Sequence, residues 1–246
     1  MSMFLKTVIA GAAIALIPLA AQATETVSIV SFAVNQAGAN LTYKNNGAAG
    51  WTLSTVSPKK VLVTLEDFDG GFVSGAAAKW SFTGTGTSFA VSTGGGLYSQ
   101  AFTGGSLSFT AVNAINIGTS VIAAGGNILT LNFTGGELSA IVPGTSGGAQ
   151  VTLPGSSFTN VSSGFLAFPP ITLTDFSLSL GNVRPGFCFT TCNVAATENS
   201  RFANFTATST GSFTATVPEP SSWALLLLGF GMVGFAARRR TVSVAA

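Results

Sequence analysis

Side chains able to carry out acid–base or nucleophilic chemistry are few in this sequence. The chain has 246 residues, no histidine, and only eight aspartates and glutamates against ten lysines and arginines. The absence of histidine excludes Ser-His-Asp and Cys-His catalysis and histidine-ligated metal sites. The chemistry that remains is that of carboxylates, cysteines and a large supply of hydroxyl and aromatic groups.

The densest group of carboxylates is Glu66, Asp67 and Asp69, in the sequence Glu-Asp-Phe-Asp-Gly-Gly. Such oxygen ligands can hold calcium, which takes about six to eight of them. The spacing is not that of an EF-hand loop, and Asp-Gly after an apolar run is a strong hairpin-turn signal. We expect a solvated turn, with calcium as the alternative, and no cofactor.

A carboxylate-dependent hydrolase is the enzymatic alternative. It requires two carboxylates from different segments across one cleft, about 5–10 Å apart. Three of the seven acids between residues 24 and 217 fall in one turn, so few carboxylates from separate segments are left to form such a pair. We therefore expect no enzymatic activity. The candidates for a pair are Glu66, Asp67, Asp69, Glu137, Asp175 and Glu198.

The two cysteines, Cys188 and Cys192, are separated by Phe-Thr-Thr. In an exported protein a disulfide is the expected state. A straight strand would hold their Cα atoms about 13 Å apart, beyond disulfide reach, so the chain must turn between them. A dithiol metal or redox site is the alternative, but further ligands for it are lacking.

Carbohydrate binding would need exposed rings or ordered hydroxyl groups. Trp51 follows Gly-Ala-Ala-Gly and, with Tyr98, is a candidate for stacking on sugars, whereas the alternation around Trp80 predicts a core position. Residues 205–217 alternate apolar or small side chains with hydroxyls. A hydroxyl array for ice or sugar needs neighbouring strands with the same pattern, and none is evident, so we expect an ordinary solvent-facing strand. These hydroxyls belong to Thr206, Thr208, Thr210, Ser212, Thr214 and Thr216.

The elements that position these groups are predicted to be strands. Between residues 24 and 217, short alternating segments are separated by Gly, Asn, Ser or Pro, and no long segment has helical periodicity. This pattern predicts an all-β body, an antiparallel β-sandwich or jelly roll. Apolar side chains switch from odd to even positions between Leu173 and Phe176, which predicts a β-bulge near Thr174-Asp175.

The two ends of the chain have a different character from the body. Residues 1–23 combine Lys6, an apolar stretch and Ala21-Gln22-Ala23, which is typical of a signal peptide cleaved after Ala23. Residues 221–237 are apolar and, as a helix, would span roughly 25 Å, at the short end for a bilayer crossing. An arginine-rich tail to residue 246 would stay in the cytoplasm.

A short motif lies just before and across this apolar stretch. Pro218-Glu219-Pro220, then Trp223-Ala224, and finally Arg238-Arg239-Arg240 resemble the PEP-CTERM sorting signal in its PEPxxWA form. The resemblance covers about residues 217–240. It implies recognition by an exosortase-type membrane protease, a transient anchor in the inner membrane of a Gram-negative bacterium, and delivery of the body to the cell surface or extracellular matrix. Such systems often accompany exopolysaccharide, which becomes a further candidate partner.

The charges support this division of the chain. Residues 24–217 hold six cations and seven anions, so the excess of positive charge belongs to the two ends. We therefore expect no nucleic-acid partner, because no basic surface is indicated. The leading hypothesis is a non-enzymatic surface or matrix protein, structural or adhesive. The alternatives are a lectin-like, carbohydrate-binding module and a tail retained as a plain membrane anchor.

Overall fold

The computed structural model describes residues 24–34, 38–66, 71–144, 149–166, 172–189, 200–218 and 229–231. The predicted signal peptide over 1–23 lies outside the described residues, as does most of the predicted transmembrane helix over 221–237, of which residues 229–231 are helical. Across the described ranges, no helix combines the length and hydrophobicity needed to cross a membrane. Residues Thr24–Val217 form one compact unit, called the body below.

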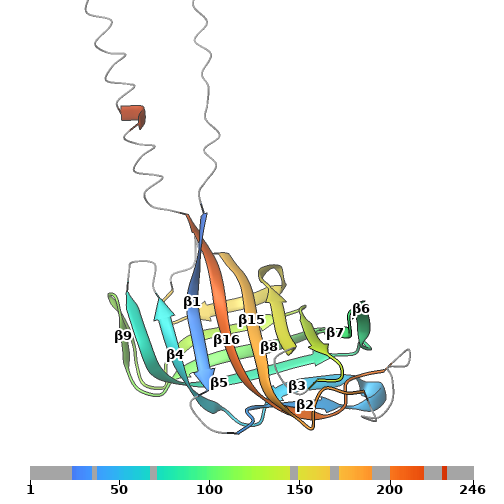
Figure 1. The fold of residues 1–246 in the computed structure, drawn as a ribbon. Coiled ribbons are helices and arrows are strands. Elements are labelled where there is room, and N and C mark those ends of the chain that lie inside the picture. The colour runs from blue at the N-terminus through green and yellow to red at the C-terminus, as the bar shows by residue number, and fades with distance from the viewer. Residues whose placement is uncertain are drawn as a thin grey trace, which may run out of the picture. The chain divides into compact units, whose positions relative to one another are not determined.

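The body is built almost wholly from antiparallel strands (Figure 1). Two single-turn 3₁₀ helices, η1 (Gly47–Ala49) and η2 (Gly155–Ser157), interrupt them. The strands are β1 (Thr24–Val34), β2 (Leu41–Asn45), β3 (Trp51–Thr55), β4 (Lys59–Glu66), β5 (Phe72–Gly86), β6 (Val91–Gly94), β7 (Leu97–Ala101), β8 (Gly104–Ala111), β9 (Ile115–Ile117), β10 (Ser120–Ile122), β11 (Asn127–Phe133), β12 (Glu137–Ile141), β13 (Ala149–Pro154), β14 (Phe158–Ser163), β15 (Thr172–Arg184) and β16 (Phe205–Pro218).

Two long strands, β5 and β16, organise the pairing. Hydrogen-bonded neighbours follow the order β14-β11-β8-β5-β3-β2-β16-β15-β13-β12-β7-β6, while β1 pairs with β16 and β4, and β4 pairs with β5. Two routes of hydrogen-bonded neighbours therefore link β5 to β16, one through β3 and β2 and the other through β4 and β1. The predicted all-β class is confirmed, as an antiparallel, sandwich-like arrangement.

Aromatic rings fill the core between strands β1, β5, β8 and β16. The Phe32 ring of β1 lies 4.9 Å from the Trp80 ring of β5 and 5.0 Å from the Phe109 ring of β8, between centroids. Phe109 lies edge-on to Phe213 of β16 at 6.3 Å. All four side chains are buried, and each such ring pair contributes about 0.5–1.5 kcal/mol beyond simple burial. The core position expected for Trp80 is confirmed.

The predicted β-bulge is present in β15. Leu173 pairs with Ala215 of β16, and the next paired residue, Asp175, lies opposite Thr214, so Thr174 is the extra residue. Leu173 and Phe176 are consequently both buried although they differ in phase along the strand. The bulge thus lets one strand bury two apolar sets of opposite parity.

Candidate binding face and sorting motif

Trp51 does not lie on the surface. It is only 1% exposed, and its ring stacks on Tyr43 at 5.5 Å and meets Phe102 edge-on at 4.8 Å. The absence of a side chain at Gly86 leaves the room that the indole occupies. The prediction of a sugar-stacking Trp51 is therefore wrong. Tyr98 is half-buried, with its ring packed edge-on against Phe189 at 4.8 Å.

The described carboxylates do not form a metal site. Glu66 is exposed at the end of β4, whereas Asp67 and Asp69 lie outside the described residues. Within the part of the chain that is described, no three metal-ligating side chains come together. Glu137 and Asp175 are exposed on the same face of the sheet. They lie two strands apart and two residues out of register, so their Cα atoms are about 12 Å apart, and neither lines the pocket described below.

The cysteine segment is anchored to the strand region that precedes β16. Cys188 is buried and disulfide-bonded. Cys192 lies outside the described residues, so the pairing of Cys188 with Cys192 stays a prediction. Next to Cys188, Phe189 forms an antiparallel bridge with Phe202, and the two rings stack at 5.8 Å.

The hydroxyls of β16 do have neighbours of the same kind, which corrects the expectation drawn from the sequence. The outward residues of β16, β15, β13, β12 and β7 lie opposite one another in rows, with about 4.8 Å between strands. We call this surface the hydroxyl face. One row consists of Thr210, Ser179, Gln150, Ser139 and Ser99, and the next of Ser212, Ser177, Thr152 and Glu137.

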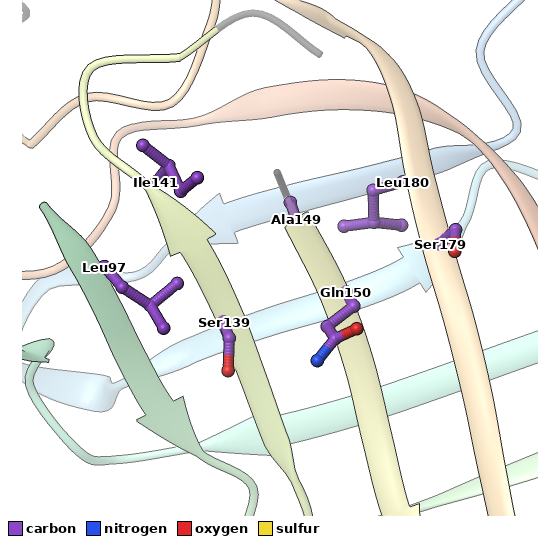
Figure 2. A pocket seen from close by; sticks show the side chains of 7 residues that line it. All are labelled: Leu97, Ser139, Ile141, Ala149, Gln150, Ser179 and Leu180. Atoms are coloured by element: carbon purple, nitrogen blue, oxygen red, sulfur yellow. The ribbon is translucent and has the colours of Figure 1, made fainter. Parts of the chain in front are cut away.

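A pocket of about 380 Å³ opens on the hydroxyl face (Figure 2). Ser139, Gln150 and Ser179 supply hydroxyl and amide groups from three neighbouring strands. Leu97 and Ile141 are cross-strand partners at its side and are 36% and 47% exposed. The remaining lining residues are Ala149 and Leu180.

The side chains that line this pocket have the chemistry needed to contact a neutral, polyhydroxylated ligand. Hydroxyl and amide groups both donate and accept hydrogen bonds, as sugar hydroxyls do. The exposed apolar pair can cover the C–H face of such a ligand, and none of the lining residues is charged. Sequence reasoning missed this site because its residues come from four strands, each of which contributes only one or two of them.

Comparison with known families identifies the C-terminal segment. The PEP-CTERM protein-sorting motif matches residues 216–240, which include all the predicted sorting residues. Searches of curated proteins and of solved structures returned no match. Because β16 ends at Pro218, the motif begins inside the last strand of the body. The sorting residues after Pro218 lie outside the described residues. The chain is therefore a protein with a PEP-CTERM sorting motif, and this motif indicates export and processing by an exosortase.

Proposed function

We propose that the protein is a non-enzymatic component of the cell surface or extracellular matrix of a Gram-negative bacterium. The observation that carries this proposal is the sorting motif at residues 216–240, joined directly to a folded all-β body. Exosortase-type processing would remove the tail after transient anchoring in the inner membrane. The body, with an aromatic core and outer faces rich in Ser and Thr, would then act as a structural or adhesive unit.

The absence of catalysis is part of the proposal and rests on side-chain chemistry. The chain has no histidine. The described pair Glu137 and Asp175 lies on an outer sheet face, exposed to solvent. Glycosidase carboxylates, in contrast, face each other across a bound sugar and need an environment that raises one pKa.

Delivery to the surface can be tested with the motif itself. Cells would carry the wild-type protein, a Pro218→Ala/Glu219→Ala/Pro220→Ala variant, or a Glu137→Ala control outside the motif. Surface labelling should detect the wild-type and control bodies, whereas the motif variant should stay in the membrane fraction. Equal surface delivery of all three proteins would overturn the proposal.

A second candidate function is carbohydrate binding at the pocket on the hydroxyl face, with exopolysaccharide as the ligand class. The row from Ser139 through Gln150 to Ser179, beside the exposed Leu97–Ile141 pair, supports it. A glycan array would compare the wild type with Gln150→Ala. The matched control is Asn132→Ala, which removes an exposed amide from the outer side of β11. Binding lost only in Gln150→Ala supports this function, and a silent wild type removes it.

A further inference from the structure

Both ends of the body chain lie at one end of the sheet. Strands β1 and β16 pair with each other, and β1 begins where β16 ends, at the top of Figure 1. We call this the tail end, because the sorting motif starts there, and the opposite end, where β16 begins, the far end. The register of the strands places each charged residue relative to these two ends.

The exposed cations of the described body gather at the far end. Lys60 lies at the far end because the next residue, Val61, pairs with Val34, the last residue of β1. Lys79 lies opposite Lys60, and Arg184 lies opposite Thr206 at the start of β16. Lys44 is also at the far end, because the preceding residue, Tyr43, pairs with Phe205, the first residue of β16. Four of these cations are exposed and the fifth is partly exposed. The full set is Lys44, Lys59, Lys60, Lys79 and Arg184.

The described acids lie elsewhere. Glu66 follows Leu65, which pairs with Val30, so Glu66 is level with the middle of β1, whereas Asp175 lies opposite Thr214 near the end of β16. Glu137 is level with the middle of β16, in the row of Ser212. Among the charged side chains that the structure describes, cations and acids are therefore separated along the strands, and the far end is basic. A surface of one sign attracts ligands of the other.

The centre of this basic end is a pair of like charges. Lys60 and Lys79 are direct cross-strand partners on β4 and β5, and both are exposed. Like charges placed directly opposite are destabilising, and the other neighbour of Lys79, Thr110 on β8, is uncharged. An anionic group held between the two ammonium groups would remove the repulsion and gain two charge-assisted hydrogen bonds.

We propose that the far end binds an anionic polysaccharide, with Lys60 and Lys79 as the principal contacts. Hydroxyl groups lie beside the pair on the side of β5 and β8. They belong to Thr110 and to the hydrogen-bonded Ser81 and Ser108, whose oxygens are 2.7 Å apart, and they suit the uncharged part of a sugar chain. A membrane is the less suitable partner because the membrane-directed motif starts at the tail end. The ligand class assigned here rests on the proposed surface location, although binding itself can be measured without it.

The test uses the full chain in detergent, with Arg238, Arg239 and Arg240 changed to Gln so that tail cations do not contribute. Binding to polygalacturonate, neutral dextran and a DNA duplex would be measured at increasing salt. We expect binding to polygalacturonate, weakened by salt, and none to dextran. Lys60→Gln/Lys79→Gln should weaken it about tenfold, whereas Lys60→Arg/Lys79→Arg should keep it within about twofold.

A matched control distinguishes the effect of the Lys60–Lys79 pair on binding from the effect of total charge. Lys44→Gln/Arg184→Gln removes the same two charges and should weaken binding less than about threefold. The Lys60→Gln/Lys79→Gln variant should unfold at the same or a higher temperature, because a repulsion is removed. Equal weakening by both double variants, no preference over dextran, or tighter binding to DNA would overturn the proposal. None of these results bears on whether the motif directs surface delivery.

Discussion

Arg201 Nη1 donates a hydrogen bond to the carbonyl oxygen of Gly47 at 2.7 Å, joining segments 154 residues apart. The same guanidinium donates to the carbonyl oxygens of Thr87 at 2.6 Å and Ser88 at 3.2 Å, and it lies 4.2 Å from the ring centroid of Phe89. Arg201 is only 9% exposed. It therefore fastens η1 and the segment after β5 to the residues that precede β16.

Replacing Arg201 should destabilise the body. Arg201→Ala should cost about 2–4 kcal/mol of unfolding free energy, because three carbonyl groups lose a charged donor. Arg201→Lys should be intermediate, since an ammonium keeps the charge but cannot span three acceptors in one plane. Urea unfolding followed by tryptophan fluorescence measures both. The exposed Arg184→Ala is the control, expected within about 0.5 kcal/mol of wild type. An Arg201→Ala protein as stable as wild type would disprove the role.

The bulge in β15 should tolerate the loss of Thr174, whereas the regular ladder that follows it should not tolerate the loss of a paired residue. Thr174→Ala removes only the contact between its hydroxyl and that of Thr214 at 3.0 Å, worth about 1 kcal/mol or less. Deleting Thr174 would leave Leu173 opposite Ala215 and Asp175 opposite Thr214 in an unbroken ladder, so both apolar sets should stay buried. Deleting Ser177, which is paired with Ser212, would instead turn Phe176 outward and should cost about 1.5–3 kcal/mol. Thermal unfolding of the two deletion variants tests this difference, and equal stabilities would contradict the assigned register.

Gly105 on β8 should not accept a methyl group. A Cβ there would meet the carbonyl of Thr83 on β5 and the ring of Phe133. Gly105→Ala should therefore cost about 1–3 kcal/mol. The adjacent Gly104 is the matched control, because its Cβ would come only to 3.3 Å from the Phe133 carbonyl oxygen. Chemical unfolding should rank Gly104→Ala as clearly more stable, and the reverse order would contradict the packing between β5, β8 and β11.

Alkaline pH should unfold the body partly through Tyr43. Its hydroxyl donates to Gln100 Oε1 at 2.9 Å, and burial raises the pKa of Tyr43 well above its usual value, with the Gln100 bond and the Arg201 charge offsetting only part of the effect. Because the folded-state pKa is raised, the contribution of the protonated Tyr43 hydroxyl to folding stability is complete below about pH 10 and is lost as pH rises further. The loss is about 1.4 kcal/mol per pH unit.

The matched variant for this effect is Tyr43→Phe. It should be less stable than wild type at pH 8, because Gln100 loses its partner, by about 1–3 kcal/mol. Between pH 8 and pH 11, however, it should lose less stability than wild type. Urea unfolding at both pH values gives the comparison, and identical losses would show that Tyr43 is not the group responsible.

Features that depend on local sequence could be predicted, and those that depend on strand order could not. The bulge at Thr174 follows from the phase of neighbouring side chains, and the sorting motif is a linear pattern. The burial of Trp51, in contrast, depends on Gly86 and Tyr43 from other strands. An isolated Gly-Ala-Ala-Gly before Trp51 indicates only a turn, which is present as η1.

The hydroxyl face and the basic far end were missed for the same reason. Ser139, Gln150 and Ser179 become neighbours only because β12, β13 and β15 pair in that order. Likewise, Lys60 and Lys79 are unremarkable in sequence and become a like-charge pair through the register of β4 and β5. Strand pairing over long sequence separations is specified by the packed core as a whole, not by the segments that pair.

The most direct measurement of the central claim is mass spectrometry of the C-terminus of protein recovered from the cell surface, with and without the exosortase-type protease. Exosortase processing predicts a chain trimmed near Pro218–Trp223 when the protease is present and an untrimmed chain when it is absent. Intact residues 225–246 on surface protein in both strains would contradict it and identify the tail as a retained anchor.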